Sequence, residues 1–217
     1  MTSSLRRQSI LDPSKTYTFR SYFEMRFPID EILQELGVTF THQELALFER
    51  ASAYKNKVTP QAQSTKQRII VAQKHVDLSS EASRREMLIA PIILDIVHLV
   101  DVKVNIEYKI EVNQFLRGDV DYYLKSKHHV LIVEAKQADL GRGFVQLAAE
   151  LIALDAWIDS KDKIIYGAVT TGDIWQFGSL DRQQKCIVQD LMLYRVPTDL
   201  EDVMAILMWM LQREEDQ

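Results

Sequence analysis

The sequence of 217 residues contains a single cysteine, Cys186. One thiol excludes an intrachain disulfide framework and a multi-cysteine zinc site, and it is typical of a reducing compartment, so we expect a cytoplasmic protein. Nowhere do about 18 apolar residues follow one another without a charge, so we expect no membrane-spanning segment. The first ten residues, MTSSLRRQSI, lack the apolar run of a signal peptide.

Positive charge is also scarce. The chain has 26 Lys and Arg against 31 Asp and Glu, which gives a formal net charge of −5. This balance argues against a protein that coats nucleic acid through charge alone. No Gly-x-x-x-x-Gly-Lys-Ser/Thr loop occurs, which excludes a P-loop ATPase motor, and the five histidines show no metal-ligand spacing.

Hydrophobic residues are plentiful, at 47% of the chain, which is enough for a packed core. A shift in composition near residue 76 predicts a helical N-terminal extension over residues 1–75 and a main domain over residues 76–217. Within the extension, the apolar spacing and the capping residues predict helices at 28–36, 41–54 and 59–73, with Pro60 in the first helical position of the last one.

The main domain alternates between helical and extended patterns in the order α-β-β-β-α-β-β-β-α, which predicts an α/β fold with a central mixed sheet flanked by helices. Helical patterns cover 80–100, which Pro91 should kink, 143–158 and 198–212. Extended patterns cover 102–112, 118–125, 130–136, 163–170, 173–178 and 185–196.

Two charged residues end a strand that is otherwise apolar on both faces. Because side chains alternate along 130–136, Glu134 and Lys136 share one face of this strand. Burying a carboxylate and an ammonium is costly unless both have partners. An aspartate on the neighbouring strand and a divalent cation would supply them, and oxygen ligands of this kind suit Mg²⁺.

Asp119 and Asp121 are both candidates for that aspartate, because they lie on the same face of their strand. Pairing Leu124 with His129 would put Asp119 opposite Glu134, with Asp121 on the diagonal. A hairpin loop longer by two residues would put Asp121 directly opposite. The pattern alone leaves both registers open.

These residues resemble the signature of the PD-(D/E)XK nucleases, the restriction-endonuclease-like superfamily. Gly118-x-x-Asp121-Tyr122 and Val133-Glu134-Ala135-Lys136 carry the resemblance, and in that motif the aspartate often follows Gly-x-x, which favours Asp121. Two further stretches, 80–94 and 167–177, are similar to the first core helix and a later hairpin in the nuclease region of type I restriction motor subunits.

The resemblance implies a restriction-endonuclease-like core and a nuclease that hydrolyses phosphodiester bonds with Mg²⁺, or with Mn²⁺ as a substitute. The implied partner is DNA, with RNA not excluded. Asp121, Glu134 and the Ala135 carbonyl would hold the metal, with Glu81 as a further ligand, and Lys136 would orient the attacking water or stabilise developing charge.

The resemblance further implies that Gln146 positions the substrate or the nucleophile. The same helix departs from the pattern, because Glu150 stands where relatives often carry tyrosine.

Two alternatives stay open. The first is a catalytically idle nuclease-fold module that binds nucleic acid or a protein partner, and the second is an assembly subunit whose N-terminal helices form a homo-oligomer.

Other polar and aromatic residues have simpler interpretations. We expect Arg84 and Arg85 to face water, with contact to phosphates as the alternative. The basic hairpin tip at 125–129 is interpreted as a solvated turn, with contact to a nucleic-acid backbone as the alternative. The three tryptophans are expected in the core: Trp157, Trp175 and Trp209.

Overall fold

The protein, seen in a computed structural model that describes residues 9–127 and 129–213, is an α/β structure built on one seven-stranded mixed sheet. The strands lie in the order β1-β7-β6-β5-β4-β3-β2. The β1/β7 and β4/β5 pairs are parallel, and the remaining pairs are antiparallel. The strands are β1 (Thr39–Gln43), β2 (Lys103–Glu111), β3 (Arg117–Lys125), β4 (Val130–Ala135), β5 (Ile164–Thr170), β6 (Ile174–Asp181) and β7 (Cys186–Arg195).

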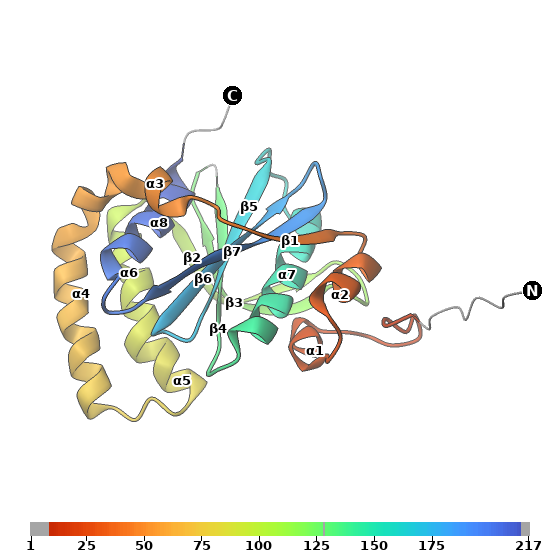
Figure 1. Ribbon diagram of the computed structural model, residues 1–217, viewed down its shortest axis with the longest axis horizontal. Coiled ribbons are helices and arrows are strands. Elements are labelled where there is room, and N and C mark those ends of the chain that lie inside the picture. Colours follow the sequence, from red (N-terminus) through yellow and green to blue (C-terminus); the bar gives the residue numbers. More distant parts are fainter. Residues whose placement is uncertain (1–8, 128, 214–217) are drawn as a thin grey trace, which may run out of the picture.

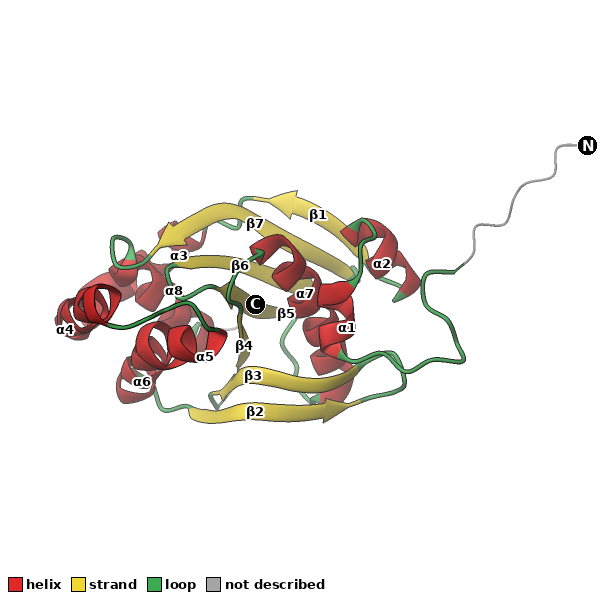
Figure 2. Cartoon of the chain, turned by 90° about the horizontal axis from the view of Figure 1, so that it is seen from below, coloured by secondary structure: helices red, strands yellow, loops and turns green. Residues whose placement is uncertain are grey.

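Helices cover both faces of this sheet (Figure 1). One face carries α3 (Leu47–Ala51), α4 (Lys55–His75), α6 (Ala90–Leu99) and α8 (Leu200–Gln212). The other carries α1 (Phe19–Glu24), α2 (Ile29–Glu35) and α7 (Leu140–Trp157). Figure 2 shows the sheet between these two helical layers, each of which encloses its own hydrophobic core.

The main domain follows the expected order of elements, and its strands begin and end within three residues of the expected positions. The predicted helix at 80–100 is divided into α5 (Glu81–Arg84), a π-helical turn η2 (Arg85–Ile89) and α6. Pro91 lies at the start of α6, where its missing N–H is tolerated. Among the described residues, no helix is long and apolar enough to cross a membrane.

Two expectations for the N-terminal stretch are wrong. The predicted helix at 41–54 is instead strand β1, the short helix α3 and a 3₁₀ turn, η1 (Ser52–Tyr54), because β1 pairs with the distant strand β7. The predicted helix at 59–73 begins earlier, at Lys55, so Pro60 lies inside α4 rather than in its first position.

The described part of the predicted extension shares both hydrophobic cores with the main domain. Leu47 and Ile69 belong to the core that contains α8, and Phe19 and Tyr22 belong to the core that contains α7. Residues 1–8 of the predicted extension, and His128 of the basic hairpin tip, lie outside the described residues.

Helix α1 is seated on β3 through a glycine that leaves room for it. Gly118 has φ of +144°, and a Cβ there would lie 2.9 Å from Cδ2 of the buried Phe19 ring. Gly37 also has a positive φ, +76°, but a Cβ there would meet nothing within 4 Å. A substitution at Gly37 therefore carries the strain of a positive φ without any loss of packing.

We expect Gly118→Ala to lower the free energy of unfolding by about 2–4 kcal/mol, because it adds a clash with Phe19 to the strain of a positive φ. Gly37→Ala, the matched control, should cost only the strain, about 1 kcal/mol. Urea unfolding of the two variants measures the difference. Equal losses would show that α1 does not pack on Gly118 as described.

Candidate active site

The charged residues singled out by the sequence meet where β3 separates from β4. The described pairing of these strands ends at Tyr122 and Val133, which places Asp121 opposite Glu134. Beyond this point the Asp121 side chain replaces the backbone partner, since its Oδ2 accepts a hydrogen bond of 2.8 Å from the Ala135 N–H. Asp119 is exposed and pairs with Lys109 of β2. The register therefore selects Asp121 as the residue at the site.

Glu134 is the centre of the cluster and is almost fully buried. Its Oε1 accepts hydrogen bonds from the Lys136 ammonium and, at 2.6 Å, from Nε2 of Gln146 on α7. Burial, followed by the nearby charge of Asp121, raises the pKa of Glu134 to about 7, although Lys136 opposes the shift. The single ammonium of Lys136 thus does not offset the burial of Glu134 and the nearby charge of Asp121.

Glu150, one turn further along α7, is a second buried carboxyl beside Glu134. Nε2 of Gln146 donates to Glu150 Oε1 at 2.9 Å and thereby bridges the two carboxyls. Oε2 of each carboxyl receives no N–H or hydroxyl hydrogen bond from any described residue. Burial first, and then the charge of Glu134, raise the pKa of Glu150 well above its usual value. The pair is therefore most stable when Glu150 carries a proton that it shares with Glu134.

Lys136 is also largely buried, in contact with groups from several elements. Burial opposes its charge, but the carboxyls of Glu134, Glu150 and Glu81 outweigh this effect and raise the pKa of Lys136. Its ammonium lies 5.3 Å from the centre of the Phe23 ring on α1, within the range of a cation–π contact. The ammonium is thus held charged at the end of β4.

Arg85 was expected to face water, and this expectation is wrong. The π-helical turn carries its guanidinium to 3.1 Å from Asp121 Oδ1 and 3.4 Å from Glu107. Arg84 is likewise engaged, with the Thr171 carbonyl at 2.7 Å and Asp173 at 2.9 Å. Because π-helical turns are often found at functional sites, the position of Arg85 on one adds to the case for this cluster.

The structure thus brings together Asp121, Glu134, Lys136 and Gln146, whereas Glu81 stands apart. Glu81 is half-buried in the first turn of α5 and acts on Lys136 through its charge, but its side chain makes no hydrogen bond or ion pair with a described residue. In the part of the chain that the structure describes, no three His, Cys, Asp or Glu side chains gather as ligands of one metal ion.

Arg85 and Glu150 are the members of the site that sequence reasoning missed. The only signal for Glu150 was its departure from the tyrosine of the resembled pattern. Nothing in the sequence indicated that Arg85 pairs with Asp121. The two residues are 36 positions apart, and the π-helical turn that directs Arg85 is not visible in residue spacing.

Comparison with protein-family models, with curated proteins and with solved structures finds no match for this chain. The chemistry of the site is therefore argued from its own geometry.

The raised pKa values predict how stability changes with pH. An unfolded glutamate titrates near pH 4.3, so the folded protein binds more protons than the unfolded chain between there and about pH 7. The stabilisation of the folded protein by these bound protons is complete below the pKa of a glutamate in the unfolded chain. It is lost as the pH rises through the raised pKa of the folded protein. We expect the melting temperature to fall over this interval.

Glu150→Gln should flatten this dependence and raise the melting temperature at pH 8, at about 2–4 °C for each kcal/mol gained. The exposed Glu86→Gln serves as the control and should leave the profile unchanged. Differential scanning calorimetry from pH 5 to pH 8 makes the comparison. Parallel profiles for the wild type and Glu150→Gln would contradict the shared-proton pair.

Proposed function

We propose that the protein is a Mg²⁺-dependent nuclease that hydrolyses phosphodiester bonds, with DNA as its substrate. The observation that carries the proposal is the placement of Asp121 opposite Glu134 at the separation of two strands, with Lys136 hydrogen-bonded to Glu134. The succession α6-β2-β3-β4-α7-β5 suits a restriction-endonuclease-like core, and we assign the fold to that class.

The donor set fits a divalent cation. The ammonium of Lys136 does not offset the burial of Glu134 and the charge of Asp121, and Glu134 Oε2 receives no hydrogen bond from an N–H or hydroxyl of the described residues. Two carboxylates are the number that Mg²⁺ usually takes from a protein, with water and substrate oxygens as its other ligands. Asp121, Glu134 and the Ala135 carbonyl would hold the ion, and Mn²⁺ would substitute. When bound, such an ion polarises a phosphoryl oxygen and lowers the pKa of a water.

The protein's own groups supply the rest of the chemistry. Lys136 holds a buried positive charge beside the carboxylates, where it would stabilise the negative charge that develops on a phosphate. Gln146 restrains the Glu134 carboxylate through its bond to Oε1. Arg85 neutralises Asp121 while no cation is present, so binding of the ion requires Arg85 to release that carboxylate.

A second function, an idle nuclease-fold module that binds nucleic acid without cleaving it, is favoured by a specific observation. Arg85 already occupies Asp121, and Glu134 and Lys136 are only 2% and 8% exposed. In such a module the Arg85–Asp121 ion pair would be permanent and the carboxylates would bind no cation.

Cleavage of plasmid DNA and of single-stranded RNA, with Mg²⁺ and with EDTA, tests the first proposal. We expect Mg²⁺-dependent cleavage, reduced at least about 100-fold by Lys136→Ala, because one stabilising group at a developing charge contributes this much. Asp121→Ala should be inactive, whereas Lys103→Ala, which changes an exposed lysine of β2, should retain full activity. Cleavage that persists unchanged in both Lys136→Ala and Asp121→Ala would refute the assignment.

Calorimetric titration with Mn²⁺ separates the nuclease from the idle module. We expect the wild type to bind Mn²⁺. Arg85→Gln should bind it roughly tenfold more tightly, a gain of about 1.4 kcal/mol, because the Arg85 guanidinium no longer competes with the ion for Asp121. Asp121→Asn should abolish binding. If neither the wild type nor Arg85→Gln binds Mn²⁺, the carboxylates are idle and the second function is correct.

A further inference from the structure

A cavity of about 430 Å³ lies at the far end of the β3–β4 hairpin from the carboxylate cluster. We call it the hairpin pocket. It opens between the hairpin tip, the last residue of α7 and the loop that follows α7. Its lining combines aromatic, basic and small polar side chains: Tyr108, Tyr123, Lys125, Ser126, Lys127, His129, Val130, Trp157, Ile158, Asp159, Ser160 and Lys161.

One wall of the hairpin pocket is an ordered group of aromatic rings. Trp157 was expected in the core, but it is 43% exposed, whereas Trp175 and Trp209 are buried. Its Nε1–H donates a hydrogen bond of 3.1 Å to the Tyr108 hydroxyl. The Tyr108 ring in turn stacks on Tyr123, with centroids 4.6 Å apart and planes 17° from parallel. An indole fixed in this way and left in contact with water offers a stacking surface.

Three ammonium groups surround this wall without counter-ions. Lys125, Lys127 and Lys161 are exposed, and none of them forms an ion pair with a described residue. The lining contains one carboxylate, that of Asp159. In a chain of net charge −5, the hairpin pocket is therefore a local concentration of uncompensated positive charge.

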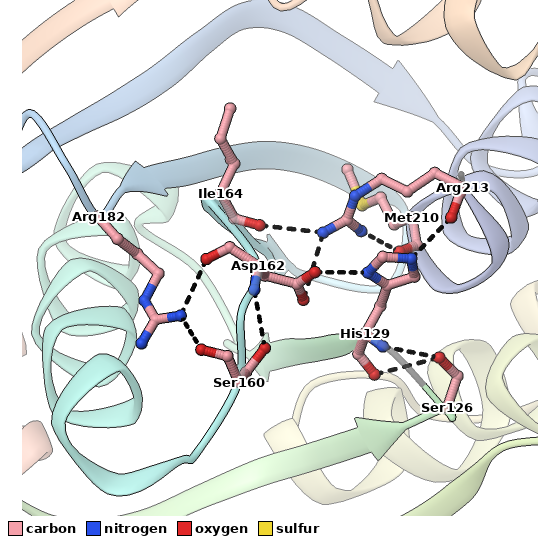
Figure 3. Close-up of polar contacts among 8 residues, drawn as sticks. All are labelled: Ser126, His129, Ser160, Asp162, Ile164, Arg182, Met210 and Arg213. Atoms are coloured by element: carbon pink, nitrogen blue, oxygen red, sulfur yellow. Dashed lines mark hydrogen bonds and ion pairs between the residues drawn. The ribbon is translucent and has the colours of Figure 1, made fainter. Parts of the chain in front are cut away.

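Three lining residues of the pocket, Ser126, His129 and Ser160, belong to a polar network that also contains Asp162 and Arg182 (Figure 3). His129 Nδ1 lies 2.8 Å from Asp162 Oδ1, and the backbone N–H of His129 donates to the Ser126 hydroxyl. The Asp162 N–H donates to the Ser160 hydroxyl, and Arg182 donates to the Ser160 and Asp162 carbonyls. Ser126 and His129 on one side, and Ser160 and Asp162 on the other, are thereby held in place before any ligand binds.

We infer that the hairpin pocket binds one nucleotide unit, with its base stacked on Trp157 and its phosphate between the lysines. An exposed aromatic ring flanked by ammonium groups is the combination that recognises an unpaired nucleotide, because every base has a face to stack and every phosphate is anionic. The unit is either a free nucleotide or part of a single strand. The site needs no metal and does not depend on the proposed cleavage.

The pocket also lies within reach of the carboxylate cluster. Lys125 lies four positions after Asp121 in β3, a distance of about 13 Å along the strand. One single strand could therefore contact both places, so the hairpin pocket would hold a segment of nucleic acid several nucleotides from Asp121.

Binding measurements in EDTA at low salt test the inference. The probes are thymidine monophosphate, a single strand of ten thymidine nucleotides, and the duplex of that strand with its complementary deoxyadenosine strand. We expect the single strand to quench the fluorescence of the exposed Trp157 and to bind more tightly than the duplex, whose bases are already stacked. Quenching by the free monophosphate as well would identify a nucleotide site, and quenching by the strand alone a strand site.

Paired substitutions assign the binding to the pocket. Lys127→Gln with Lys161→Gln should weaken strand binding about tenfold. The slope of log affinity against log salt should fall by the amount expected for the loss of one to two phosphate contacts. Lys15→Gln with Lys74→Gln removes the same charge from exposed positions elsewhere and should stay within about twofold of the wild type. Trp157→Phe should abolish the quenching but retain the fold.

Any of three results would overturn the inference. The two double-lysine variants could bind the strand equally well, the wild type could bind strand and duplex with equal affinity, or Trp157 fluorescence could stay unchanged with every probe. All binding is measured in EDTA, where the proposed Mg²⁺-dependent cleavage cannot occur, so a failure of the proposed nuclease activity would not be confused with a failure of this site.

Discussion

The structure around the candidate site depends on a carboxylate that cannot be solvated. Glu134 lies on the central strand β4 and is 2% exposed, so its charge must be balanced by protein groups. Lys136, Gln146 and the carboxyl of Glu150 are all directed at it, each from β4 or α7. Helix α7 can approach this closely because Gly143 faces the strand, where a Cβ would lie 2.8 Å from Val169 and 3.0 Å from Lys136. The absence of a side chain at Gly143 thus lets α7 pack closely and place Gln146 against Glu134.

The N-terminal stretch contributes to this environment. Phe19 of α1 packs on Gly118, three residues before Asp121, and Phe23 lies over the Lys136 ammonium. On the other face, η2 brings Arg85 to Asp121. The carboxylates are therefore enclosed from both sides by segments that precede the motif strands, and this accounts for their low exposure.

Much of the main domain could be predicted from the sequence, because apolar alternation and long amphipathic runs reflect burial directly. Strand β1 could not. Its residues TFTHQ are mostly polar and exposed, and they form a strand only because β7 offers them a parallel edge. The start of α4 was also misplaced, since helical structure continues from α3 through η1 instead of beginning at a new cap.

The candidate site was predictable to the extent that alternation along one strand determines it. That reasoning placed Glu134 and Lys136 together, and the resemblance added Asp121 and Gln146. The choice between Asp119 and Asp121 depended on the length of the hairpin loop, which spacing does not reveal. Arg85 and the shared proton of Glu150 depend on contacts between distant elements, and no local pattern encodes such contacts.

The proposed function requires that Asp121 and Glu134 form a cation site, which Arg85 occupies in the absence of metal. A crystal of the protein soaked in Mn²⁺ and measured at the manganese edge tests it most directly. We expect one anomalous peak at the carboxylates of Asp121 and Glu134, with Arg85 moved away from Asp121. A crystal without that peak, in which the Arg85–Asp121 ion pair is intact, would contradict it.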